Sequence, residues 1–276
     1  MNLKKYSILS IICLLNFSFG VYREDVSIEK HIELASDKEF DCVGKILNEG
    51  GILIGSGVLI NENWVITAGH VVEDVLNSKL RFKSNNIIYD SEKVILYPDY
   101  KSNVLGHNGD VALIKIKASK KQIEPATSFN GNEIVGKQII YVGYGTSGKG
   151  KQAIKKPTPA GRKLAGTNII DATGQESIDD RELPDQFLIA DFDHPTHKEL
   201  NRIGSATPTD LEYFPMGGDS GGGAFVKVGN KFYLVGIHSG ATAKINDDIN
   251  LGLHGSLIYT TNLSFYKDWI SETIKI

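Results

Sequence analysis

The sequence predicts an all-β protein. The chain of 276 residues contains 29 glycines, and its apolar residues fall in many short β-rich runs separated by turn residues, a pattern typical of strands joined by tight turns. Asn48-Glu49-Gly50-Gly51 interrupts the apolar stretch from Cys42 to Ile54 and predicts a hairpin. The next two runs, Val58-Leu59-Ile60 and Trp64-Val65-Ile66, predict two strands joined by a polar turn.

The first 20 residues have the organisation of a secretory signal. Lys4 and Lys5 precede an apolar run from about Ile8 to Phe19, and Ser18-Phe19-Gly20 is a small-x-small cleavage site. A membrane anchor is the weaker alternative, because the run is shorter than the roughly 20 apolar residues that a span needs. Cys13 follows Ile12 rather than the small residue of a lipoprotein signal. We therefore expect a secreted or periplasmic protein without membrane attachment once the signal is removed.

Composition narrows the remaining possibilities. Cys42 is the only cysteine after Gly20, so no intramolecular disulfide is expected and packing must hold the exported fold together. A net charge of −3 with 23% charged residues lacks the basic character of a nucleic-acid-binding protein. We expect a monomer whose partner is a protein or peptide substrate.

Further runs complete the expected strands. Residues 80–82, 87–89, 94–97 and 137–144 predict strands, and 111–116 predicts one that is buried on both faces. The polar segment 119–128, which contains Pro125, is the predicted linker between two domains. Residues 263–276 are predicted to form a short C-terminal helix. Within the poorly patterned stretch 171–215, Asp191 to His197 include metal-ligand residue types without a known spacing, and we expect no metal there.

Three polar residues are candidates for chemistry. Ser220 lies in a run of seven residues, 217–223, of which five are glycine, followed by the strand-like Ala224-Phe225-Val226. Such a backbone allows close approach of a ligand, so Ser220 is a candidate nucleophile, although Ser/Gly runs are usually flexible loops. His70 ends Thr67-Ala68-Gly69-His70 and Asp110 precedes the buried run. Alone, each also fits a surface histidine or a turn-capping aspartate.

Taken in order, these motifs resemble one family. Thr-Ala-Gly-His at 67–70, Asp-Val-Ala-Leu-Ile at 110–114 and Gly-Asp-Ser-Gly-Gly at 218–222 are similar to the motifs of the chymotrypsin/trypsin family of serine endopeptidases. The likeness extends to 143–146, to 234–240 and to 268–270. It implies two packed antiparallel six-stranded β-barrels, over 32–118 and 129–262, with the active site between them. The chain most resembles bacterial, secreted members without disulfides, since Val71 and Met216 stand where others have half-cystines.

The resemblance implies a role for each of these residues. Ser220 would attack the scissile carbonyl, His70 would act as general base and acid, and Asp110 would orient His70. The N–H groups of Gly218 and Ser220 would form the oxyanion hole. Ser239 would hydrogen-bond Asp110. No metal or organic cofactor is required.

The resemblance also implies activation by a new N-terminus. In the family, a newly created α-amino group pairs with the acid that corresponds to Asp219 and orders the oxyanion loop. By likeness and by distance to His70, Ile32 is the candidate terminus, with 21–31 as a propeptide. The usual Ile-Val-Gly-Gly is missing at this point.

Substrate preference is left open by the sequence. Phe214 stands where trypsin-like members have an aspartate at the pocket floor, so an Arg/Lys preference is not supported. His238, which precedes Ser239 and Gly240 on the predicted pocket wall, resembles the histidine of glutamyl endopeptidases, but Pro215 replaces their hydroxyl residue. The alternatives are an acidic preference and a small or apolar one.

Two other functions fit parts of the sequence. Gly218 to Gly222 also matches the G-x-S-x-G elbow of α/β-hydrolases, which would predict a serine esterase. That elbow requires a helix after the serine and its partner residues later in the chain, whereas a strand is predicted here. The second alternative is a catalytically silent, protease-like binding protein, although members of that kind usually lack one of the three residues.

Overall fold

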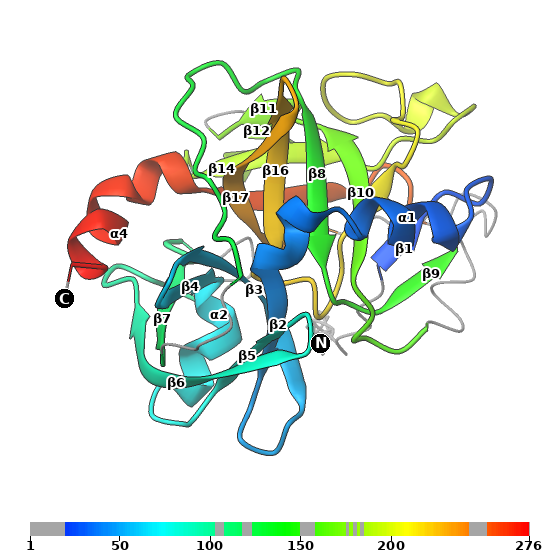
Figure 1. Cartoon of the computed structure of the whole chain (residues 1–276). Helices are drawn as coiled ribbons and strands as arrows, with labels where there is room; N and C mark the ends of the chain where they lie inside the picture. Colours follow the sequence, from blue (N-terminus) through cyan, green and yellow to red (C-terminus); the bar gives the residue numbers. More distant parts are fainter. Residues whose placement is uncertain are drawn as a thin grey trace, which may run out of the picture.

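The computed structural model describes residues 20–102, 108–117, 123–149, 158–174, 177–178, 181–182, 185–242 and 253–275 (Figure 1). The predicted signal lies outside the described residues apart from Gly20. Among the described residues, the structure contains no helix that is long and apolar enough to cross a membrane.

The first unit is a closed antiparallel barrel of six strands, as predicted. Its order is β2-β3-β4-β7-β6-β5. The strands are β2 (Val43–Leu47), β3 (Leu53–Asn61), β4 (Trp64–Thr67), β5 (Arg81–Ser84), β6 (Ile87–Leu96) and β7 (Ala112–Ile116). The turn Asn61-Glu62-Asn63 joins β3 to β4, and the amide of Asn63 donates to the side chain of Asn61 at 2.9 Å. In β7, as its continuous apolar run predicts, Ala112, Leu113, Ile114 and Ile116 are all buried.

The second unit is built on a seven-stranded sheet of order β10-β8-β16-β17-β18-β14-β11. These strands are β8 (Gln138–Gly143), β10 (Leu164–Ile169), β11 (Ala172–Thr173), β14 (Phe187–Asp191), β16 (Gly223–Val228), β17 (Lys231–Thr242) and β18 (Leu257–Asn262). The sheet curves until β10 approaches β14. There the side-chain amide of Asn168 donates to the backbone carbonyl of Asp191 at 2.8 Å. The predicted fold class is confirmed, with a half-barrel of seven strands as its second unit.

The remaining strands form two small sheets apart from the barrel and the seven-stranded sheet. β1 (Gly20–Tyr22) lies between β15 (Tyr213–Phe214) and β9 (Ser147–Lys149), antiparallel to the first and parallel to the second. β12 (Ser177–Ile178) pairs with β13 (Arg181–Glu182) in an antiparallel arrangement. Val21 and Tyr22 are buried in the core of the second unit.

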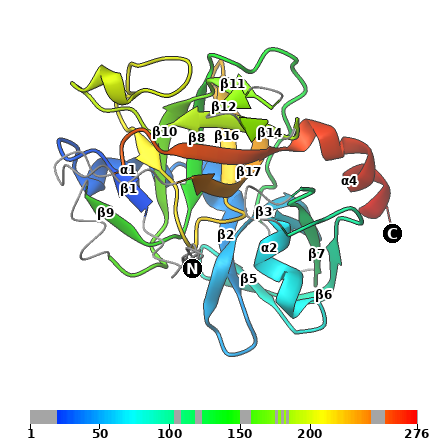
Figure 2. The same ribbon diagram turned by 180° about the vertical axis from the view of Figure 1, so that it is seen from behind.

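Short helices flank the sheets, as Figures 1 and 2 show from two sides. They are α1 (Ile28–Ala35), α2 (Gly69–Val72), α4 (Lys267–Thr273) and the 3-10 turns η1 (Lys38–Cys42), η2 (Glu73–Val75), η3 (Lys198–Leu200) and η4 (Leu263–Tyr266). The predicted C-terminal helix corresponds to η4 and α4, and the Trp269 ring meets Tyr97 edge-on at 5.2 Å. Helix α1 crosses the predicted boundary at residue 32 and contacts β10, because the buried His31 ring hydrogen-bonds the Ala165 carbonyl at 2.8 Å.

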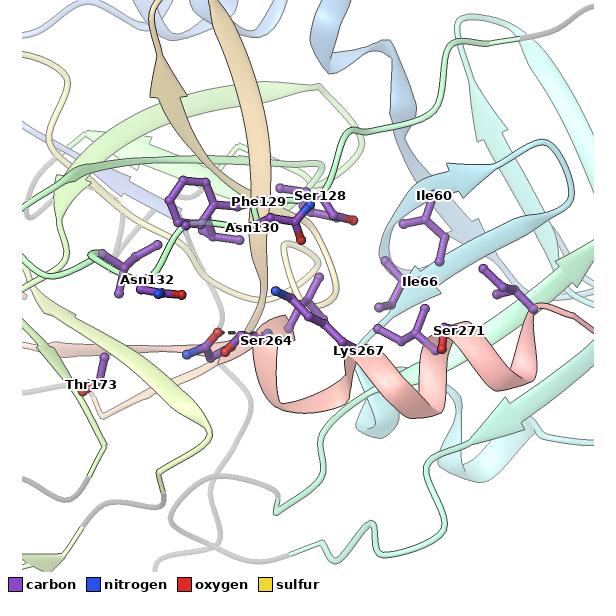
Figure 3. A pocket seen from close by; sticks show the side chains of 18 residues that line it. Ile60, Ile66, Ser128, Phe129, Asn130, Asn132, Thr173, Ser264, Lys267 and Ser271 are labelled. Atoms are coloured by element: carbon purple, nitrogen blue, oxygen red, sulfur yellow. Dashed lines mark hydrogen bonds between the residues drawn. The ribbon is translucent and has the colours of Figure 1, made fainter.

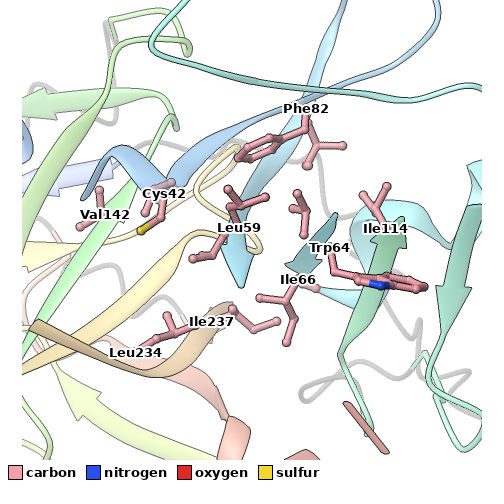
Figure 4. Close-up of a cluster of buried hydrophobic side chains, with 14 of the residues drawn as sticks. Cys42, Leu59, Trp64, Ile66, Phe82, Ile114, Val142, Leu234 and Ile237 are labelled. Atoms are coloured by element: carbon pink, nitrogen blue, oxygen red, sulfur yellow. The ribbon is translucent and has the colours of Figure 1, made fainter. Parts of the chain in front are cut away.

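The largest apolar core runs through both units (Figure 4). Leu59 and Ile66 of the barrel belong to the same cluster as Leu234 and Ile237 of β17. Cys42, also in this cluster, is a free and buried thiol. Because the two units share one close-packed core, their relative positions are fixed. Side chains that the two units contribute to their interface are therefore held at fixed distances from one another.

Candidate active site

His70 and Asp110 come together at one end of the first barrel. His70 lies in the short helix α2, three residues beyond the end of β4, and Asp110 lies just before β7, which pairs with β4. Asp110 accepts a hydrogen bond from the backbone N–H of His70 at 2.9 Å, and its Oδ2 is 2.9 Å from His70 Nδ1. The side chain of Asp110 is fully buried, whereas that of His70 keeps 20% of its surface exposed.

Residues of the second unit complete the surroundings of Asp110. The Ser239 hydroxyl donates to Asp110 Oδ2 at 2.5 Å, so the expected hydrogen bond is present. Thr261 donates to the Asp110 carbonyl at 3.1 Å. Both oxygens of the buried carboxylate therefore accept hydrogen bonds, as a buried charge requires.

The two ionisable groups stabilise each other's charged form. Burial alone would raise the pKa of Asp110, but the charge of His70 and the hydrogen bonds from His70 and Ser239 lower it below its ordinary value. Burial would likewise lower the pKa of His70, and the charge of Asp110 and their hydrogen bond raise it instead. A proton taken up by this imidazole is thus stabilised beside a carboxylate that stays ionised.

Ser220 lies in a tight turn of the second unit that is seated against the first barrel. Its carbonyl accepts from the Ser56 amide at 2.8 Å, and the next amide, of Gly221, donates to the His238 carbonyl at 2.8 Å. Gly221 has φ +77°, and a Cβ there would lie 2.1 Å from Thr67 Oγ1. Only glycine permits this approach, which brings Ser220 beside the segment that leads to His70.

The peptide before Gly218 is turned so that its N–H is available. The Gly217 carbonyl accepts from the Thr146 amide at 3.0 Å. Because C=O and N–H point in opposite directions across a trans peptide, the Gly218 N–H is directed away from Thr146. Within the described part of the chain, neither this N–H nor that of Ser220 donates to another group. The two donors are therefore available to an incoming oxyanion.

Asp219 is buried beneath this turn and accepts three hydrogen bonds. Its donors are the Gly145 amide at 2.7 Å and the Met216 amide and Tyr213 hydroxyl at 3.0 Å. A Cβ on Gly145 would come within 2.5 Å of the carboxyl group, so a side chain there is excluded. Burial raises the pKa of Asp219 to about 6, and these hydrogen bonds offset only part of that effect.

Ile32, the expected partner terminus of Asp219, lies elsewhere. It is in the middle of α1, and none of the three donors to Asp219 comes from that helix. Cutting before Ile32 would also remove the buried Val21, Tyr22 and His31. The segment next to the oxyanion loop is instead β1, through its pairing with β15.

The predicted pocket residues have different surroundings. Phe214 is fully buried in the second core, with its ring 5.8 Å from that of Phe192. His238 is 3% exposed, and burial, with the nearby charge of His70, lowers its pKa to about 3, so the imidazole is neutral at neutral pH. It therefore provides no fixed positive charge for an acidic substrate. A side chain on Gly240 would enter open space.

Three supporting residues were missed by sequence reasoning. Ser56 and Tyr213 bind the oxyanion turn and its acid, and Thr261 binds Asp110. Ser56 had a local signal, since it stands between Gly55 and Gly57 at the start of an apolar run. Tyr213 and Thr261 had none, because ordinary strand residues surround them.

A cavity lies apart from these groups (Figure 3). It has a volume of about 460 Å³ and lies between α4, residues 128–134 and strand β17. None of His70, Asp110 and Ser220 lines it. The chemistry described above therefore belongs to the interface of the two units and not to this cavity.

A second group of ionisable residues is buried in the second unit, away from His70. Burial raises the pKa of Asp171 to about 6 and that of Asp191 to about 7. Burial, followed by the charges of these two, raises the pKa of Asp193 to about 8, and burial also raises that of Glu212. The described residues contain no group of three or more His, Cys, Asp or Glu side chains suited to a metal.

We expect this acidic group to make the protein less stable as the pH rises from 6.5 to 8. The folded chain holds protons on Asp191 and Asp193 that an unfolded chain has already lost above pH 4–5, so stability falls as these groups ionise. The decrease should be on the order of 2 kcal/mol. Urea unfolding at pH 6.5, 7 and 8 measures it. The buried histidines with lowered pKa values, His31, His238 and His254, oppose this trend mainly below pH 6.5.

Two variants identify the source of that pH dependence. Asp193→Asn should flatten the slope, whereas Asp268→Asn, on the exposed face of α4, should leave it unchanged. A stability that rises between pH 6.5 and 8 would contradict the prediction.

Comparison with known proteins places this geometry in a family. A sequence model described as Trypsin matches residues 31–193, a range that includes His70 and Asp110 and ends before Ser220. The calcium-dependent serine proteinase of Mesocricetus auratus is 25% identical over 244 residues, which cover 79% of this chain and 32% of that protein. The chain thus spans about a third of the length of that relative. The solved structure of neuropsin, a serine protease of mouse brain, is similar in fold, with a TM-score of 0.61 at 20% identity over 92% of this chain and 99% of neuropsin.

Proposed function

Because this chain belongs to the trypsin family of serine endopeptidases, we propose that it is an exported endopeptidase that uses Ser220, His70 and Asp110 to hydrolyse protein or peptide substrates. One observation carries the proposal. The turn that holds Ser220 and the pair formed by His70 and Asp110 are joined across the two units by hydrogen bonds from Ser56 and Ser239.

The chemistry follows from the hydrogen bonds of this arrangement. Ser220 Oγ attacks the carbonyl carbon of the scissile bond while His70 Nε2 takes the hydroxyl proton, since Nδ1 is engaged by Asp110. The protonated His70 then delivers that proton to the leaving amine, and an acyl-enzyme remains on Ser220. Water, deprotonated by His70, releases the acid product.

The charge that develops on the substrate oxygen is met by the N–H groups of Gly218 and Ser220. These donors are already oriented in the free chain, so they need little reorganisation when the charge forms. The bond from Thr146 to the Gly217 carbonyl supports this orientation.

The two alternative functions are less well supported. Gly223–Val228 is strand β16, whereas the elbow of an esterase leads into a helix. A silent binding protein would not need the paired His70 and Asp110 together with free oxyanion donors.

Labelling with a fluorophosphonate tests the proposed function, because this reagent is captured only by an activated serine. Intact mass should show one adduct on the mature protein and none on Ser220→Ala. Peptides with Glu, Leu or Arg before the scissile bond would then show the preferred substrate class. A folded, mature wild-type protein that forms no adduct and cleaves no peptide would support the binding-protein alternative instead.

We further propose that removal of the signal itself creates the activating terminus, at Val21. Along β1, the partner of Tyr22 is Tyr213 and that of Val21 is Phe214, so the strand direction from Tyr22 to Val21 points towards Met216. On its other side, Val21 pairs with Gly148 and Gly20 with Ser147, so the same direction points towards Gly145. The amides of Met216 and Gly145 are the donors to Asp219.

An α-amino group at this point would supply the charge that Asp219 lacks. The raised pKa of Asp219 reflects burial, and no cation is among the groups that lower it. An ammonium group would keep the carboxylate ionised in the folded state. Removing one partner of such a buried ion pair destabilises the structure by about 3–5 kcal/mol.

Extending the N-terminus should therefore inactivate the protein. A chain that begins at Val21 should be active, and one with five additional residues before Val21 should lose roughly 10²- to 10⁴-fold in kcat/KM, the equivalent of a broken buried ion pair. Peptide hydrolysis by the two purified forms measures the effect. Five residues added after the C-terminus provide the control. Equal activity of the Val21 form and the extended form would exclude this activation.

A further inference from the structure

Ser56 links the two units at the oxyanion turn. It lies in β3 of the first barrel and is fully buried. Its Oγ donates to the Gly218 carbonyl at 2.7 Å and accepts from the Tyr144 amide at 3.0 Å. Its amide donates to the Ser220 carbonyl at 2.8 Å. One residue of the first barrel thus contacts both oxyanion-hole residues and the strand end that lies beneath them.

The same residue is also tied to the segment that carries His70. The Thr67 hydroxyl donates to the Ser56 carbonyl at 2.7 Å, and Thr67 is three residues before His70. Ser56 therefore connects the nucleophile's turn by hydrogen bonds to the end of β4, two residues before the helix that carries His70.

We propose that Ser56 is a positioning residue whose hydroxyl fixes the Gly218 peptide and thereby holds the oxyanion donors at their distance from His70. The inference rests on the proposed function of Ser220. Gly218 has φ +92° and no side chain, so its backbone has more conformations available than that of other residues. Its amide side is restrained through the Gly217 carbonyl, and its carbonyl side through Ser56.

Loss of the hydroxyl should affect turnover more than substrate binding. Without Ser56 Oγ, the Gly218 carbonyl and the Tyr144 amide are left without their partner, and both gain by moving towards other donors and acceptors. Such a movement would misalign the donors that stabilise the transition state, while the substrate pocket stays in place. Removing an oxyanion donor outright lowers kcat by about 10²- to 10³-fold, so we expect a smaller loss, of about 10- to 100-fold, from loosening one.

The test compares two buried serines of the same barrel. Ser84 in β5 is 1% exposed and donates to the carbonyls of Asp41 and Val43 at 2.6 and 3.0 Å. Ser84→Ala therefore removes a similar hydroxyl from the barrel without touching the oxyanion turn. Ser56→Cys keeps nearly the same volume but provides a weak donor, so it separates the hydrogen bond from packing if Ser56→Ala does not fold.

The measurements are kcat and KM for one peptide, the rate of fluorophosphonate labelling, and the melting temperature of each variant. We expect Ser56→Ala and Ser56→Cys to lower kcat and the labelling rate with KM nearly unchanged. Ser84→Ala should lower only the melting temperature. Folded Ser56 variants with kcat within twofold of an active wild-type protein, or an equal loss of kcat in Ser84→Ala, would overturn this inference alone. An inactive mature wild-type protein would instead overturn the proposed function, and this inference with it.

Discussion

Replacing Ser220 by alanine is expected to lower kcat by about 10⁶-fold, the size of the loss when one member of a Ser-His-Asp set that acts as a unit is removed. The hydroxyl is the proposed nucleophile, and the backbone N–H of residue 220 would remain as an oxyanion donor. The residual rate should therefore exceed that of water alone. Steady-state hydrolysis of a peptide at neutral pH measures the loss.

The fold of this variant should be preserved, because Ser220 is bonded to the first barrel through its backbone carbonyl. The Ser56 amide can still donate its hydrogen bond to the carbonyl of residue 220. An unchanged melting temperature, compared with that of the exposed Ser264→Ala, would attribute the loss of activity to chemistry. Undiminished hydrolysis by pure Ser220→Ala would exclude the acyl-enzyme mechanism.

Much of this site was predictable because each chemical group is set in a short local motif. The aspartate at 110 precedes a continuous apolar run, and the histidine at 70 follows one, so both were expected where buried strands begin and end. The structure pairs these strands, β4 and β7, as neighbours. The glycines around Ser220 likewise predicted a backbone that approaches other atoms closely. In the structure, Gly221 lies so close to Thr67 that a side chain would not fit between them.

What escaped prediction depends on contacts between distant parts of the chain. The bond between Ser56 and Gly218 joins residues 162 positions apart, and no local pattern reports such a pairing. Strand β1 has three residues, too few for an alternation of apolar and polar side chains. The same is true of β15, so the sheet that brings residues 20–22 to the oxyanion loop could not be read from the sequence. The expectation of a terminus at Ile32 came from likeness and from the distance to His70 along the sequence, and no local pattern indicated that this residue lies within the eight-residue helix α1.

The largest remaining effect is expected at Asp110. Asp110→Asn should lower kcat at neutral pH by about 10⁴-fold, the size of the loss that this change causes in the Ser-His-Asp template. An asparagine would present either an N–H or a carbonyl to His70 Nδ1. The backbone N–H of His70 donates to one carboxylate oxygen and the Ser239 hydroxyl donates to the other. The amide nitrogen of an asparagine, itself a donor, would therefore face another donor in either position. When the amide nitrogen faces His70, the tautomer with its proton on Nδ1, whose Nε2 can act as base, loses its acceptor.

The pH profile separates this effect from general damage to the site. The charge of Asp110 is the main influence that raises the pKa of His70 against the effect of burial. The activity of the wild-type protein should therefore fall off on the acid side at a pH above the ordinary histidine value of about 6.5. In Asp110→Asn, the midpoint of the residual activity should move to lower pH, because burial then acts on His70 without its counter-charge. Asp99→Asn, an exposed change in the same barrel, should leave both the rate and the midpoint unchanged. A midpoint that stays in place in Asp110→Asn while the rate falls would mean that Asp110 acts on His70 through orientation alone and not through its charge.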